Sequence, residues 1–121
     1  MAERERLICA ASEVAEQGKG VRFELERFGK QQPAFVVRFD GQPRAFLNQC
    51  GHVPVELDWQ AGEFFDDTRH YLICATHGAL YHPATGACVG GRCAGRGLIR
   101  LPVVERDGHV YLIDVPLTEI A

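Results

Sequence analysis

The fold class of this sequence is decided by Val103-Val104-Glu105-Arg106-Asp107-Gly108-His109-Val110-Tyr111. Runs rich in β-branched and aromatic residues stand on both sides of Asp107-Gly108, and this dipeptide favours the tight turn of a two-residue β-hairpin. The second run continues to Val115. The sequence therefore predicts an antiparallel hairpin over residues 103–115.

Working outward, several other segments have the same character. Residues 21–26 alternate apolar and polar side chains, the period of a half-buried strand. Residues 34–39 and 44–47 flank Asp40-Gly41 as a second hairpin, and shorter apolar segments lie at 71–73, 79–81 and 87–89. A helix of one or two turns is expected only over residues 12–17, with Ser12 as its N-cap. The predicted fold is all-β, a small antiparallel sandwich or partly open barrel.

Length and composition set limits on the function. The 121 residues fit one domain, which we expect to span residues 1–121 without a linker. Hydrophobic residues make up 46% and charged residues 24%, which is normal for a globular protein. The net charge of -3 and the lack of a long basic run argue against nucleic acid as a partner. Neither a signal peptide nor an apolar run of roughly 20 residues is visible, so we expect a cytoplasmic protein with no membrane partner.

Two short motifs, here called knuckles, carry the candidate chemistry. The first is Cys50-Gly51-His52 and the second is Cys74-Ala75-Thr76-His77, separated by residues 53–73. Each knuckle places a thiolate and an imidazole on one turn, and glycine lets the backbone approach a metal closely. A structural zinc site accepts two Cys and two His, but it usually pairs Cys with Cys and His with His. Mixed knuckles favour a two-iron cluster, with zinc as the alternative.

A mixed ligand set changes the charge of such a cluster. With two thiolates on one iron and two neutral imidazoles on the other, the oxidised cluster is formally neutral and the reduced one carries a single negative charge. Four thiolates would make both states two units more negative. Mixed clusters are therefore easier to reduce, at about -150 to +300 mV instead of near -400 mV.

Cys-x-His followed by Cys-x-x-His resembles the Rieske iron–sulfur family, as do the hairpin before the first knuckle, the turn at Thr85-Gly86 and the closing hairpin. The resemblance implies one Rieske domain with one [2Fe–2S] cluster, bound by a subdomain over about residues 48–100. Its ligands would be Cys50, His52, Cys74 and His77, with His52 and His77 exposed as the entry and exit points for electrons. It also implies that the chain is an electron carrier and not an enzyme.

Departures from the family pattern indicate the class of Rieske protein. The positions of the extra cysteines in high-potential members hold Val55 and Thr76, so that disulfide is absent. Ala79 stands where those members have a serine that bonds a sulfide, whereas Tyr81 matches a tyrosine that can donate to a cysteine sulfur. Fewer donors leave more negative charge uncompensated and lower the potential. The chain therefore resembles the low-potential soluble Rieske ferredoxins.

In that family setting, the chain would pass single electrons from a flavoprotein reductase to a terminal oxygenase, such as a ring-hydroxylating dioxygenase, or to another redox protein. One alternative is a small Rieske subunit of a larger oxidoreductase, as in nitrite reductases. A redox-sensing interaction module is another. A permanent subunit would show a large apolar surface, and a sensor would bind its partner differently in its two oxidation states.

The remaining cysteines and histidines have simpler interpretations. Cys9 and Cys88 are expected to be small hydrophobic strand residues, Cys93 an exposed thiol, and a Cys88–Cys93 disulfide is disfavoured in a reducing compartment. His70, His82 and His109 are expected on the surface or at strand ends. The acidic and aromatic segment 59–67 is expected to be a solvated loop over the core, or a docking patch for a basic partner.

Overall fold

The computed structural model describes residues 4–27, 29–49, 56–58, 60, 62–74, 78–91 and 97–114. Its described part contains ten strands and one 3-10 turn, η1, which confirms the all-β prediction. No helix in this part is long and apolar enough to span a bilayer. The elements are β1 (Arg4–Ala10), η1 (Ala11–Glu13), β2 (Val21–Arg27), β3 (Lys30–Phe39), β4 (Gln42–Leu47), β5 (Leu72–Ile73), β6 (Leu80–Tyr81), β7 (Cys88–Gly90), β8 (Arg100–Leu101), β9 (Val103–Arg106) and β10 (His109–Asp114).

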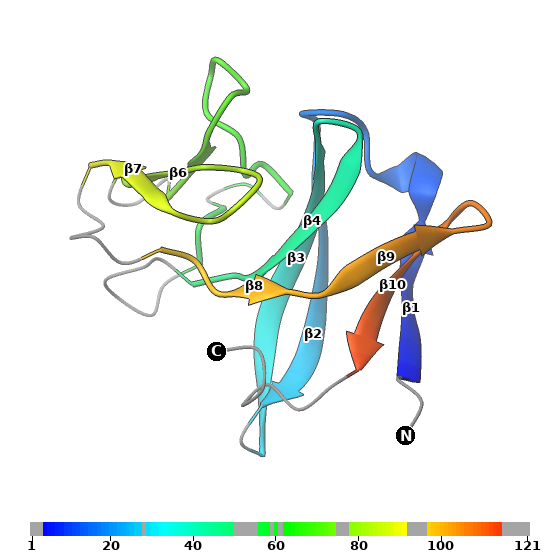
Figure 1. The fold of residues 1–121 in the computed structure, drawn as a ribbon. Helices are drawn as coiled ribbons and strands as arrows, with labels where there is room; N and C mark the ends of the chain where they lie inside the picture. The colour runs from blue at the N-terminus through cyan, green and yellow to red at the C-terminus, as the bar shows by residue number, and fades with distance from the viewer. Residues whose placement is uncertain are drawn as a thin grey trace.

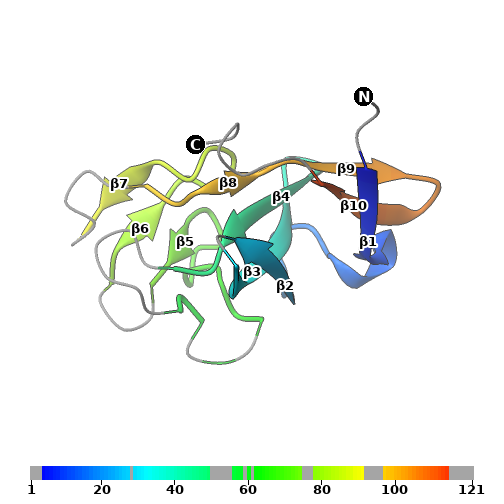
Figure 2. The same cartoon turned by 90° about the horizontal axis from the view of Figure 1, so that it is seen from below.

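The strands form three antiparallel sheets, with the orders β1-β10-β9, β2-β3-β4-β8 and β5-β6-β7. Figure 1 shows the β5-β6-β7 sheet at one side of the molecule and the β1-β10-β9 sheet at the other. The four-stranded sheet lies between them, as the perpendicular view in Figure 2 also shows. The small sheet is inserted in sequence between β4 and β8, which pair with each other.

β3 explains why two cores meet at this central sheet. Successive side chains of a strand point to opposite faces. Phe35 and Val37 belong to one buried cluster, with residues of β5 and β6, and Ala34 and Val36 belong to a second, with residues of β1 and β10. All four side chains are fully buried. A strand covered on both faces is expected to be a continuous apolar run, as residues 34–37 are.

Local turn chemistry fixes the two predicted hairpins. Asp40 and Gly41, between β3 and β4, have φ of 57° and 74°, and Asp107 and Gly108, between β9 and β10, have 54° and 77°. Positive φ at both central residues is the requirement of the hairpin turn for which the sequence selects these residues. The Glu16 carboxylate also accepts hydrogen bonds from the backbone N–H groups of Asp40 and Gly41, at 2.7 and 2.9 Å.

Two expectations for the N-terminal part need correction. The predicted helix over residues 12–17 is wrong, because only η1 is helical and Ala10, not Ser12, stands at its N-cap. The Glu13 carboxylate accepts the hydrogen bond of the Ala10 N–H at 2.8 Å, which is the contact that the third helical residue makes in a capping box. The edge strand β1 was not predicted. It pairs along β10 over Arg4–Ala10.

Candidate functional site

Cys74 lies at the closed end of the β5–β6 hairpin. Its N–H donates to the Ala79 carbonyl at 2.9 Å, and the Gly78 N–H donates to the Cys74 carbonyl at 2.7 Å. These two bonds close the chain around residues 75–77, so the second knuckle is held at one hairpin end. Residues 75–77, including the predicted ligand His77, lie outside the described residues.

The Cys74 side chain is buried and is not part of a disulfide. It belongs to the same core cluster as Ala79 and Tyr81. Cys74 lies opposite Ala79, and Leu72 pairs with Tyr81, so these side chains share one face of the small sheet. Tyr81 is fully buried on β6, two residues from Ala79. The sequence prediction that Tyr81 is a sulfur donor stays a prediction.

Gly91 brings a third segment against the second knuckle. It has φ of +76°, and a Cβ atom at this position would lie 2.5 Å from the Gly78 carbonyl oxygen and 2.8 Å from the Ala79 Cα. Both are backbone atoms, which cannot rotate away as a flexible side chain can. Only glycine therefore allows the end of β7 to pack this closely on the Cys74 hairpin. This close approach joins segments that are separated in the chain, so the sequence alone does not predict it.

The first knuckle follows β4, and its flanks are joined by a buried polar pair. The Asn48 Nδ2 donates to Asp58 Oδ1 at 3.0 Å, and the Leu57 N–H donates to Asn48 Oδ1 at 2.8 Å. Asp58 Oδ2 accepts the Gly62 N–H at 2.9 Å. Asn48 and the Asp58 carboxylate are both fully buried. This Asn48–Asp58 pair closes the chain between its members, where Cys50 and His52 lie outside the described residues.

Arg22 of β2 adds a positive charge at the edge of this pair. Its Nε lies 3.5 Å from Asp58 Oδ2, and one terminal nitrogen lies 2.7 Å from Glu56 Oε1. The Arg22 side chain is 41% exposed, whereas the Asp58 side chain is inaccessible to solvent. A buried carboxylate is tolerated only when donors surround it, and here two N–H donors and one cation do so. The residues around the first knuckle are therefore fixed by polar contacts from three segments.

The remaining cysteines differ from expectation in one case. Cys9 is a buried free thiol on β1, as predicted, and burial, followed by the nearby Glu13 carboxylate, raises its pKa to about 11. Cys88 lies on β7 and packs on the core, but it is disulfide-bonded. The prediction of a simple hydrophobic thiol at Cys88 is therefore wrong. Cys93 lies outside the described residues.

The three remaining histidines, His70, His82 and His109, belong to neither knuckle. His70 and His109 are exposed and His82 is half-buried. His82 Nδ1 accepts the Ala84 N–H at 3.0 Å and so orders the turn between β6 and β7. Within the described residues, no three His, Cys, Asp or Glu side chains form a group able to hold a metal. Three of the four predicted ligands lie outside those residues.

The acidic and aromatic segment 59–67 is only partly the solvated loop that was expected. Phe64 is fully buried and stacks on Phe35, with ring centroids 3.9 Å apart and an interplanar angle of 11°. The expectation is therefore wrong for Phe64, whereas Glu63 and Asp67 are exposed as predicted. Trp59 lies outside the described residues. The docking role for this segment stays a prediction.

The described donor fits an iron–sulfur centre. Cys74 places a cysteine sulfur that is not in a disulfide inside an apolar cluster, at a hairpin end closed by Gly78, and cysteine thiolates are the usual ligands of iron–sulfur clusters. Asn48, Asp58 and Gly91 are the functional residues that sequence reasoning missed. Asn48 precedes the first knuckle by two positions and Gly91 follows Gly90, but nothing local distinguishes them from ordinary loop residues.

Comparison with known proteins identifies similar molecules. The family model for the Rieske [2Fe-2S] domain matches residues 5–110. No curated protein matches the sequence. The Sphingomonas yanoikuyae B1 ferredoxin is 27% identical with a TM-score of 0.70, covering 93% of this chain and 100% of that one. The ferredoxin of carbazole 1,9a-dioxygenase from Nocardioides aromaticivorans IC177 is 19% identical with a TM-score of 0.68, covering 92% and 98%. The terminal oxygenase of carbazole 1,9a-dioxygenase from the same organism is 20% identical with a TM-score of 0.67, and the match covers 93% of this chain and 31% of that one.

Proposed function

Because the chain belongs to the Rieske [2Fe-2S] domain family, we propose that it carries single electrons on one [2Fe–2S] cluster. The proposed ligands are Cys50, His52, Cys74 and His77. The observation that supports this most directly is Cys74, a buried cysteine outside any disulfide that is held at a closed hairpin end. When bound, the cluster accepts and donates one electron.

The chain's own residues have separate tasks in this proposal. Cys74 supplies a thiolate from an apolar environment, and the Gly78 and Gly91 backbones keep the second knuckle close to the end of β7. The Asn48–Asp58 pair holds the flanks of the first knuckle. Tyr81 is proposed as a donor to a cysteine sulfur. The proposed cluster-binding portion, about residues 48–100, includes the whole β5-β6-β7 sheet inserted between β4 and β8.

The proposed partners are a flavoprotein reductase as electron donor and a terminal oxygenase as acceptor, in the cytoplasm. The similar structures include a complex of reduced oxygenase and oxidised ferredoxin in carbazole 1,9a-dioxygenase, 23% identical over 90% of this chain with a TM-score of 0.68. Among the described residues, the exposed large hydrophobics are Leu7, Tyr71 and Val89, on three separate segments. This scatter favours a separate carrier over a subunit fixed in a larger oxidoreductase.

Stopped-flow spectroscopy tests this function. The full-length protein is mixed with a ferredoxin reductase and NADH, and the reduced protein is then mixed with an oxidised Rieske oxygenase. We expect uptake of one electron per chain, followed by reoxidation that becomes faster with oxygenase concentration. A protein that takes up no electron, or that exchanges electrons only inside a permanent complex, would overturn the carrier role.

A further inference from the structure

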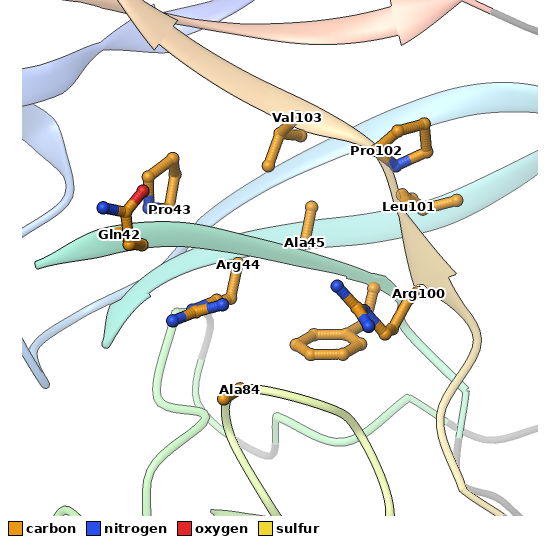
Figure 3. A pocket seen from close by; sticks show the side chains of 10 residues that line it. Gln42, Pro43, Arg44, Ala45, Ala84, Arg100, Leu101, Pro102 and Val103 are labelled. Carbon is orange, nitrogen blue, oxygen red and sulfur yellow. The ribbon is translucent and has the colours of Figure 1, made fainter. Parts of the chain in front are cut away.

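Arg44 and Arg100 line a pocket of about 210 Å³ on the central sheet. Figure 3 shows both side chains on the same side of β4, with Ala84 of the β6–β7 turn facing them. The strand register explains this arrangement. Phe46 pairs with Arg100 across β4 and β8, and Arg44 is two residues before Phe46. Arg44 and Arg100 are therefore diagonal neighbours on one sheet face.

Neither guanidinium forms an ion pair with another residue that the structure describes. Within the described residues, the ion pairs involve Arg22, Arg38 and Arg106, and no carboxylate lies within 4.0 Å of Arg44 or Arg100. The Arg44 Nε donates weakly to the Phe39 carbonyl at 3.4 Å, which leaves its terminal nitrogens available. Two like charges placed as neighbours on one face repel each other.

We propose that Arg44 and Arg100 bind a small oxyanion, a phosphate or carboxylate group, in this pocket. Guanidinium groups recognise both groups through paired N–H donors. The pocket volume suits a small free anion, and its lining includes polar backbone and side-chain atoms of β4 and β8. A bound anion would offset the repulsion between the two arginines.

The position of the pocket gives the anion a structural consequence. β4 and β8 share only two residue pairs, Ala45–Leu101 and Phe46–Arg100. The same pocket is lined by Ala84, from the turn beyond β6. An anion held by Arg44 and Arg100 would therefore join β4 to β8 at the point where the inserted small sheet returns to the central sheet.

Isothermal titration calorimetry on the full-length protein tests this site, with inorganic phosphate and succinate as probes and sodium chloride at matched ionic strength as the blank. We expect saturable binding of at least one probe at one site, and the tighter probe identifies the preferred class. Arg44→Gln and Arg100→Gln should each weaken binding about tenfold, since each removes a charge-assisted contact. Arg6→Gln removes the same charge at an exposed position of β1, and this variant should bind the anion as tightly as the wild type does.

Amide NMR spectra of the unmutated protein give an independent readout, in which the signals of Ala84 and Val103 should move with the same saturation curve. Absence of saturable binding for both anions would overturn the proposal. Equal weakening of anion binding in the Arg6→Gln variant would overturn it as well, because binding would then depend on the overall charge. Unchanged binding in both pocket variants would also overturn it, because the anion would then bind elsewhere.

Discussion

The Asn48 carboxamide and the Asp58 carboxylate are hydrogen-bonded to each other in the protein interior, with 3.0 Å between Nδ2 and Oδ1. The pair joins the residues before and after the first knuckle. Both groups also bind backbone N–H groups, those of Leu57 and Gly62. Backbone positions on both sides of the proposed ligands Cys50 and His52 are thereby fixed.

Removing the carboxylate should destabilise the fold. Asp58→Ala leaves the Asn48 amide and the Gly62 N–H buried without an acceptor, and each such group costs about 1–3 kcal/mol. We expect the free energy of unfolding in urea to fall by about 2–4 kcal/mol. Asp67→Ala, at an exposed position of the next loop, should change it by less than about 0.5 kcal/mol. Equal effects of the two substitutions would show that the buried pair stabilises nothing.

The close approach at Gly91 gives a second prediction. Gly91→Ala places a Cβ 2.5 Å from the Gly78 carbonyl oxygen, so backbone must shift at the second knuckle. The free energy of unfolding should fall by about 3 kcal/mol or more, and iron content should fall with it.

Gly41→Ala is the matched control for this change. Gly41 has nearly the same φ, +74°, but open space around the added Cβ. The Gly41→Ala substitution should lower the free energy of unfolding by only about 1 kcal/mol, the cost of a non-glycine residue at positive φ, and it should leave the iron content unchanged. If Gly91→Ala behaved like Gly41→Ala, the packing of β7 on the hairpin would not matter for the site.

Tyr81 gives a prediction about the reduction potential. If its hydroxyl donates to a ligand sulfur, Tyr81→Phe removes about 1 kcal/mol of stabilisation of the reduced state. That corresponds to a potential lower by roughly 40 mV for one electron. Tyr111→Phe, on β10 in the distant sheet, should leave the potential unchanged. Protein-film voltammetry measures both variants, and an unchanged potential in Tyr81→Phe would rule out the donor role.

Cys9 predicts how stability changes at alkaline pH. Burial raises the pKa of its thiol from 9.0 to about 11. Since the folded-state pKa lies above the unfolded one, the protonated thiol stabilises the fold fully below pH 9.0, and this contribution is lost as the pH rises through about 11.

The measurement is the difference in unfolding free energy between wild type and Cys9→Ser, whose hydroxyl does not titrate in this range. We expect this difference to shift against wild type by at most about 2 kcal/mol between pH 9.0 and pH 11. A difference that stays constant across this range would mean that Cys9 is not buried as the structure places it.

Elements that are fixed by interactions between neighbouring residues could be predicted from the sequence, whereas elements fixed by contacts between distant residues could not. The hairpins at Asp40-Gly41 and Asp107-Gly108 were predictable because the turn residues themselves carry the required positive φ. β1 was not, because its Arg4-Glu5-Arg6 start has no strand pattern. It is formed by pairing with β10 and by the Glu5–Arg106 ion pair, a contact across the whole chain.

The same distinction applies to the site. Cys74 could be proposed as a ligand from the sequence because Cys74-Ala75-Thr76-His77 places two metal-ligand residue types within four consecutive positions, and this role stays a prediction. The Asn48–Asp58 hydrogen bond and the close contact of Gly91 could not be predicted, because an asparagine or glycine in a loop usually stabilises the turn in which it lies. Their roles depend on contacts made in the folded chain, those of Gly91 with Gly78 and Ala79 and those of Asp58 with Asn48 and Gly62.

Electron paramagnetic resonance of the dithionite-reduced, anaerobically purified protein tests the central claim most directly, with iron, sulfide and zinc measured on the same sample. We expect a rhombic signal with the low average g value of a mixed Cys/His cluster. Cys74→Ser should abolish this signal, whereas Cys9→Ser, at another described cysteine outside any disulfide, should retain it. A colourless, EPR-silent protein that holds zinc, and that stays so after anaerobic reconstitution with iron and sulfide, would contradict the assignment of a [2Fe–2S] electron carrier.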